Sequence, residues 1–79
     1  MLYIFHVTCG YDYSGSPVRD CGVFKDFERA MAQAVSEMEY HGESASTQSM
    51  ARYGSLNVNG EWEWEVDEYF YRIVRREVK

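Results

Sequence analysis

Residue types that mark specialised classes of protein are scarce in this sequence. Its 79 residues include one proline, two cysteines and six glycines. Two cysteines are too few for a disulfide scaffold, and no apolar run approaches the roughly 20 residues that cross a bilayer as a helix. The first residues also lack the basic stretch and the small-residue cleavage site of a signal peptide. We therefore expect a cytoplasmic protein with reduced thiols and no membrane partner.

Basic residues are also few. Eight Lys and Arg side chains against 13 Asp and Glu give a formal net charge of −5 when the histidines are neutral. Such a chain is poorly suited to bind nucleic acid directly, because the phosphates need basic groups. The charge balance instead predicts a protein partner with a basic surface.

Aromatic side chains, in contrast, are abundant. Seven Tyr, four Phe and two Trp make up 16% of the chain, and apolar residues make up 46%. So much ring surface in a short chain argues against disorder. The length is that of one domain, expected over residues 1–79, and so small a core is only marginally stable alone. A homodimer or a tight partner would add stability and is left open.

The pattern of apolar residues predicts an α+β fold of order β-β-α-β-β-β, with a mostly antiparallel sheet and one helix on one face. Apolar residues recur at spacings of three and four over residues 26–41, as in an amphipathic helix. Asp26 is a typical N-cap, and Gly42 is a typical residue just beyond a helix.

The remaining segments are expected to be strands and loops. Two strands that form a hairpin are predicted over 2–9 and 18–24, with Gly10 ending the first. The small polar residues over 43–49 favour a loop, and we expect a further strand to start near Arg52.

The last third of the chain predicts a hairpin in some detail. Apolar and acidic residues alternate strictly over 61–66, and a last strand is expected over 69–78. A two-residue turn at Asp67-Glu68 then places Trp62 opposite Ile73, and glutamates opposite an arginine on the other face, as cross-strand pairs prefer. The helix is expected to cover the face that carries the tryptophans.

An Asn59-Gly60 pair just before this hairpin is a strong turn signal. We expect a bulged three-residue loop there, because that register places Leu56 opposite Trp62. Phe70 and Val74 are expected on the sheet face away from the helix, which could be solvated or form a dimer interface.

In this arrangement the loops 10–17, 41–49 and 67–68 meet at one end of the sheet, which is then acidic and rich in tyrosine. Tyrosine is a favoured interface residue, and carboxylates suit a basic partner. The candidate partner-binding residues lie at this end and along the alternating strand: Tyr11, Asp12, Tyr13, Glu43, Glu61, Glu63, Glu65, Asp67 and Glu68.

Residues that could carry catalysis or bind a metal form no familiar constellation. Cys9 and Cys21 are expected to face each other across the first hairpin as structural thiols, with a metal site or a disulfide as alternatives, and their spacing matches no zinc pattern. His6 should lie on the opposite face from Cys9, and His41 should interact with the helix dipole and pair with Glu37. We therefore predict no enzyme, no catalytic or metal-binding residues and no cofactor.

The chain resembles the small acidic accessory proteins of phages and mobile elements, including inhibitors of the anti-CRISPR type. The resemblance lies in general features of the whole chain, which are the length, the acidic run over 61–68, the single predicted helix over 26–41 and the aromatic content. It implies a non-enzymatic protein that blocks a basic, nucleic-acid-binding site or the assembly of a host complex. The alternative is a homo-oligomeric small-molecule-binding or regulatory domain with a ligand among the loops at 10–17, 41–49 and 67–68.

Overall fold

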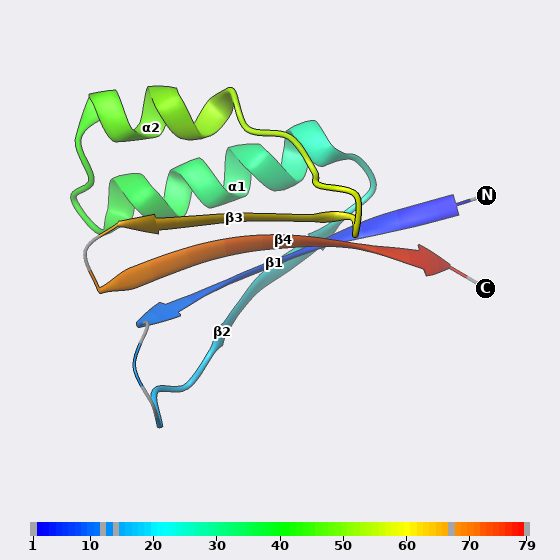
Figure 1. The fold of residues 1–79 in the computed structure, drawn as a ribbon, viewed down its shortest axis with the longest axis horizontal. Coiled ribbons are helices and arrows are strands. Elements are labelled where there is room, and N and C mark those ends of the chain that lie inside the picture. The colour runs from blue at the N-terminus through cyan, green and yellow to red at the C-terminus, as the bar shows by residue number, and fades with distance from the viewer. Residues whose placement is uncertain (1, 12, 14, 67, 79) are drawn as a thin grey trace.

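The computed structural model describes residues 2–11, 13, 15–66 and 68–78. Four strands form one antiparallel sheet in the order β2-β1-β4-β3, and both helices lie over the same face of it (Figure 1). The α+β class is as predicted, but the described residues hold two helices and four strands. The elements are β1 Leu2–Tyr11, β2 Arg19–Phe24, α1 Phe27–Tyr40, α2 Ala45–Arg52, β3 Glu61–Val66 and β4 Tyr69–Val78.

Helix α1 follows the apolar periodicity of its sequence. Asp26 is the N-cap, and its Oδ1 accepts a hydrogen bond of 2.8 Å from the Arg29 backbone amide. Gly42 follows the helix with a φ of 78°, a left-handed conformation that glycine adopts without strain. The predicted helix and both of its end signals are confirmed. Its buried residues are Ala30, Met31, Ala34, Val35, Glu37 and Met38.

The N-cap can be tested directly. Replacing Asp26 with alanine should lower the free energy of unfolding by about 1 kcal/mol, because the Arg29 amide loses its acceptor. Urea denaturation of the variant and the wild type measures the difference. Asp26→Asn keeps an acceptor and is the matched control, expected to retain most of the stability. Equal stability of D26A and the wild type would contradict the role of this cap.

The segment after α1 departs from the sequence-based prediction. In place of a loop over 43–49 and a strand near Arg52, the chain forms helix α2, with Ser44 as its N-cap. The Ser44 Oγ accepts a hydrogen bond of 3.1 Å from the Thr47 amide. Serine and threonine compete with the backbone for hydrogen bonds, so the local sequence favours a loop. The segment is helical because tertiary contacts stabilise the helix: α2 packs against α1, and Ala51 is fully buried.

The predicted pairing of Leu56 with Trp62 is wrong, because no described residue before β3 joins it as a strand. The asparagine–glycine signal still forms a turn, in which the Gly60 amide donates to the Asn57 carbonyl at 3.0 Å. The Arg75 amide donates to the Gly60 carbonyl at 2.7 Å and ties this turn to β4. Leu56 is half-buried and packs against the core from the loop.

Strand β1 is longer than predicted. It does not end at Gly10 but continues to Tyr11, because these two residues pair with Phe70 and Tyr69 of β4. The long partner strand supplies backbone hydrogen bonds that outweigh the tendency of glycine to end a strand. The extension carries Tyr11 to the end of the sheet where the predicted site lies.

The register of the last hairpin is confirmed. Trp62 pairs with Ile73 and Trp64 with Tyr71, so both indoles lie on the face that the helices cover. On the other face the Arg72 Nη2 donates to a Glu63 carboxylate oxygen at 2.8 Å. The alternation of apolar and acidic residues along β3 sets this register, because a slip by one residue would expose the tryptophans.

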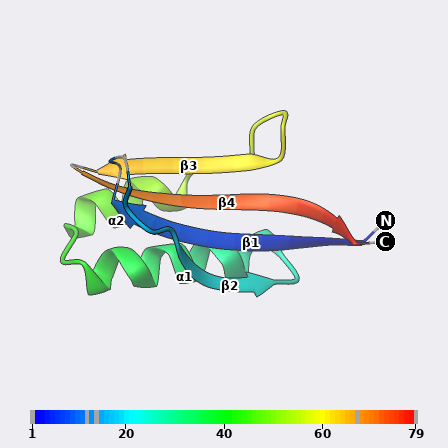
Figure 2. The same cartoon turned by 90° about the horizontal axis from the view of Figure 1, so that it is seen from below.

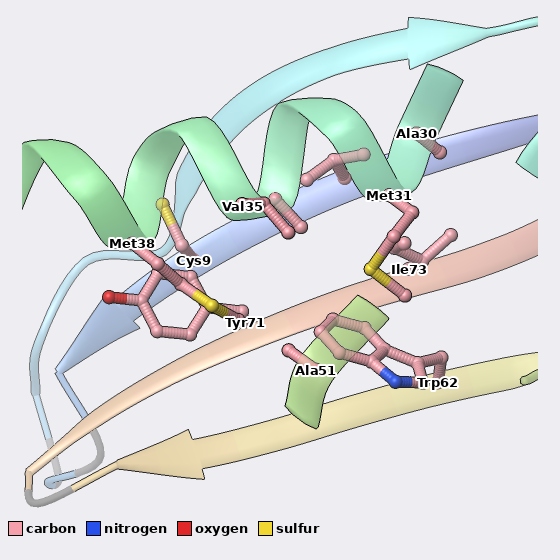
Figure 3. Close-up of a cluster of buried hydrophobic side chains, with 11 residues drawn as sticks. Cys9, Ala30, Met31, Val35, Met38, Ala51, Trp62, Tyr71 and Ile73 are labelled. Atoms are coloured by element: carbon pink, nitrogen blue, oxygen red, sulfur yellow. The ribbon is translucent and has the colours of Figure 1, made fainter. Parts of the chain in front are cut away.

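The core lies between the sheet and the two helices (Figure 3). Trp62 and Ile73 of the sheet, Met38 of α1 and Ala51 of α2 are among its buried side chains. In Figure 2 the strands pass in front of the helices, and their order across the sheet can be followed. The face away from the helices carries half-buried side chains that include Ile4, His6, Phe70 and Val74.

Candidate functional site

One end of the sheet brings together segments far apart in the sequence. The end of β1, the end of α1, the end of β3 and the start of β4 lie at the left of Figure 1. The loops predicted to meet, 10–17, 41–49 and 67–68, each contribute to a hollow there. Asp12 and Asp67 fall outside the described residues. The hollow measures about 480 Å³ and is lined by Tyr11, His41, Glu43, Val66, Glu68 and Tyr69.

The loops meet by a route that differs from the predicted one. Helix α1 ends at the hollow, α2 carries the chain to the other end of the sheet, and β3 returns (Figure 1). Helix α2 therefore runs in the direction expected of the missing strand. The β3–β4 turn consequently reaches the same end as in the predicted arrangement.

Aromatic rings form much of the hollow. The Tyr69 ring lies 4.1 Å from the His41 ring and 5.0 Å from the Tyr11 ring, measured between centroids. The Tyr13 ring lies 5.6 Å from the Tyr11 ring, tilted by 35°, and both residues are more than half exposed. The His41 Nδ1 forms a hydrogen bond of 2.7 Å with the backbone carbonyl of Glu37, which holds the imidazole in place. Several ring faces are thus available to a ligand or partner.

The lining of the hollow carries negative charge. Glu43 is half-buried and Glu68 is exposed, and none of the six lining residues is Lys or Arg. Carboxylates and aromatic faces together are the groups that bind guanidinium and ammonium ions in proteins. The chemistry of the hollow therefore suits a cationic group.

The glutamates of β3 belong to a different surface. Glu61, Glu63 and Glu65 alternate with the tryptophans and so lie on the face away from the helices. Glu63 is held by Arg72, whose Nε and Nη2 donate at 3.1 and 2.8 Å. Strand β3 is an edge of the sheet, where such charges oppose pairing with another strand. The structure therefore does not bring these predicted partner-binding residues together with the hollow.

Beneath the hollow, the two cysteines meet as predicted. A β-bulge between Val7 and Thr8 shifts the β1–β2 register, and the Cys9 and Cys21 Sγ atoms lie 2.8 Å apart as free thiols. Burial raises the pKa of the Cys21 thiol, and the hydrogen bond with Cys9 adds to this. The Tyr69 hydroxyl donates to the Cys9 Sγ at 3.7 Å, which connects the thiols to the floor of the hollow.

Glu37 of α1 joins the cysteines, although the sequence predicts a pair with His41. A carboxylate oxygen of Glu37 and both Sγ atoms lie within 4.8 Å of one another. The carboxylate is drawn away from His41 because its Oε1 accepts from Gln33 at 3.2 Å and its Oε2 lies 3.6 Å from Arg19. One sign of this in the sequence is that Glu37 lies three residues after Ala34, within the buried stripe of the helix.

The other histidine is remote from the thiols. His6 lies on the opposite face from Cys9, as predicted, and its Nε2 is 3.0 Å from the Asp20 Oδ1. A hydrogen bond from the Gly22 amide, and then the bond with His6, lower the pKa of the Asp20 carboxyl. The pair organises the β2 bulge on the open face of the sheet.

Comparisons of this chain with protein-family models, curated proteins and solved structures gave no match. The class is therefore defined by the fold: a small α+β domain with a four-stranded antiparallel sheet and two helices on one face. Within the part of the chain that the structure describes, no helix is long and apolar enough to span a membrane.

Proposed function

We propose that this chain is a non-enzymatic binding protein whose hollow takes a basic segment of a protein partner. The observation that carries the proposal is the lining of the hollow, which combines two acidic residues, Glu43 and Glu68, with the aromatic residues Tyr11, His41 and Tyr69. An arginine or lysine gains both a charge-assisted hydrogen bond and a cation–π contact in such a place. The volume of about 480 Å³ is that of a typical ligand site, so a short segment fits.

The finer proposal concerns what the partner does. A host site built to bind phosphates is basic, and it attracts a well-placed acidic surface. By occupying that site in the host cytoplasm, this chain would exclude nucleic acid or prevent assembly of the complex. This is the action that the resemblance to anti-CRISPR inhibitors implies, and it requires no catalysis and no direct contact with nucleic acid or membrane.

The test uses two double variants with equal loss of negative charge. Glu43→Gln/Glu68→Gln alters the hollow, whereas Glu28→Gln/Glu77→Gln alters the start of α1 and the end of β4, at the far end of the molecule. A partner is isolated from the native host with wild-type bait, and its affinity for each form is measured at rising salt. We expect the hollow variant to bind the partner at least about tenfold more weakly than the wild type, and the control variant to bind it about as tightly as the wild type. The affinity of the wild type should fall as the salt concentration rises.

A competition measurement addresses the finer proposal. The wild type should displace labelled nucleic acid from the isolated partner, and Glu43→Gln/Glu68→Gln should displace it poorly. Equal affinity of the two double variants, or affinity indifferent to ionic strength, would show that the hollow is not the binding site. If the wild type binds the partner but does not displace the nucleic acid, the inhibitory action is contradicted and the partner-binding function is not.

The hollow also keeps the alternative function open. Its place among the loops at 10–17, 41–49 and 67–68, and its volume, fit a small-molecule site. Because Glu43 and Glu68 line it, the ligand favoured is a small organic cation. A thermal shift with simple amines that disappears in Glu43→Gln/Glu68→Gln, together with failure to isolate a protein partner, would favour this function.

A further inference from the structure

Two thiols and a buried carboxylate meet where β1, β2 and α1 pack together. Cys9 is fully buried and points from β1 toward α1 (Figure 3). Cys21 is half-buried, and Glu37 of α1 is buried. We propose that these three side chains form a binding site for a thiophilic divalent cation, of which Zn²⁺ is the example. The site is independent of the proposed partner-binding function.

The geometry is within reach of one ion. The two Sγ atoms are 2.8 Å apart, and a Glu37 carboxylate oxygen lies within 4.8 Å of both. Zinc binds sulfur at about 2.3 Å and oxygen at about 2.0–2.2 Å. Tetrahedral coordination keeps two sulfurs about 3.8 Å apart, so they separate by about 1 Å when the ion enters. Cys21 can move in this way, because it lies at the bulge of the edge strand β2.

The state of Glu37 is an independent indication of a ligand. Its side chain is only 10% exposed, yet its Oε2 has no hydrogen-bond partner and only the Arg19 guanidinium nearby, at 3.6 Å. A buried polar atom without a partner is costly and needs an explanation, of which an ion is one. A cation bound to the carboxylate and both thiolates supplies the close contact that Arg19, at 3.6 Å, does not.

Charge and neighbouring donors fit the same assignment. On binding, each thiol releases one proton, so the cation with two thiolates and one carboxylate carries a net charge of −1. The Arg19 guanidinium, 3.6 Å from the Glu37 Oε2, compensates this charge. The Tyr69 hydroxyl donates to the Cys9 Sγ, as groups around metal-bound thiolates commonly do. Three protein ligands leave a fourth position for water.

A disulfide between the same cysteines explains less of the arrangement. It would join the two sulfur atoms but leave the Glu37 Oε2 buried without a hydrogen-bond partner. The metal accounts for the carboxylate as well as the thiols, and we therefore favour it. The disulfide is one outcome of the test below.

The test is a titration of reduced, chelator-treated protein with Co²⁺ as a spectroscopic probe. We expect one equivalent to bind with a thiolate-to-cobalt charge-transfer band, and Zn²⁺ to displace it. Cys21→Ser should weaken that band and the affinity. Glu37→Gln keeps the shape of the side chain and should weaken binding by about tenfold or more, whereas Glu39→Gln, an exposed change on the same helix, should bind like the wild type.

Several results would overturn the proposal. One is the absence of a thiolate-to-cobalt band in wild-type protein whose two thiols are free. Another is a Glu37→Gln variant that binds the metal as tightly as the wild type. A third is a loss of two hydrogens in the mass of metal-free protein kept in air. The last result assigns a disulfide instead. If Cys21→Ser does not fold, Zn²⁺ should still slow the reaction of the wild-type thiols with a thiol reagent, and an unchanged rate counts against the site.

Discussion

Truncating Ile73 to alanine is expected to lower the free energy of unfolding by about 2–5 kcal/mol. Ile73 is fully buried on β4, between Val7 and Trp62 of the neighbouring strands, so the loss includes the cavity left behind. Small domains have total stabilities of about 5–15 kcal/mol, so this is a large fraction. Urea denaturation measures the loss, and the melting temperature should fall by about 8 °C or more.

The matched control is the same truncation at Ile4. Ile4 is half-buried on β1 and lies on the sheet face away from the helices, so Ile4→Ala should cost clearly less than Ile73→Ala. If the two changes cost the same and stability rises with protein concentration, a second copy covers the open face. Small effects at both positions would contradict the location of the core.

The second large effect is expected at alkaline pH. Burial raises the pKa of the Tyr71 phenol above its ordinary value of 10.0, and the nearby charges of Glu43 and Cys9 raise it further. Above about pH 10 the unfolded chain releases a proton that the folded chain keeps, so the unfolded state binds fewer protons. Stability should therefore fall with rising pH by about 1.4 kcal/mol per pH unit for this group. Burial raises the pKa of Tyr69 as well, which steepens the fall.

Urea denaturation of reduced, metal-free protein between about pH 8 and about pH 11 measures this slope. Tyr71→Phe should make the fall of stability with pH less steep by the contribution of about one proton. Tyr53→Phe, at a position that is 87% exposed, should leave the slope unchanged. At neutral pH, Tyr71→Phe should be at least as stable as the wild type, because the Tyr71 hydroxyl is buried without a hydrogen-bond partner. The same slope in Tyr71→Phe and the wild type would contradict the assignment.

The most accurate sequence-based predictions concern segments whose own pattern decides the structure. Helix α1 has a complete apolar stripe with Asp26 and Gly42 at its ends, and the β3–β4 hairpin alternates strictly. Helix α2 lacks both features, and its serines and threonines favour a loop until Ala51 packs against the core. A glycine such as Gly10 predicts the end of a strand, but here the residue stays in β1 because it pairs with Phe70 of β4.

The candidate site shows the same division. The meeting of the loops around Tyr11, His41 and Glu68 was predicted from helix length and strand direction, with a strand in the place of α2. The prediction holds because α2 runs in the direction expected of that strand. The position of Glu37 beside Cys9 could not, because it depends on how α1 is rotated and seated on the β1–β2 hairpin.

Local patterns in the amino-acid sequence are enough to predict the α+β class, the amphipathic helix α1, the register of the last hairpin and the acidic and aromatic residues of the loops. Each of these follows from periodicity or charge within a short stretch of chain. Two features could be learned only from the tertiary structure: the helical state of α2 and the position of Glu37 beside two cysteines. These features depend on contacts between distant segments, whose packing energies outweigh local preferences of a few tenths of a kcal/mol.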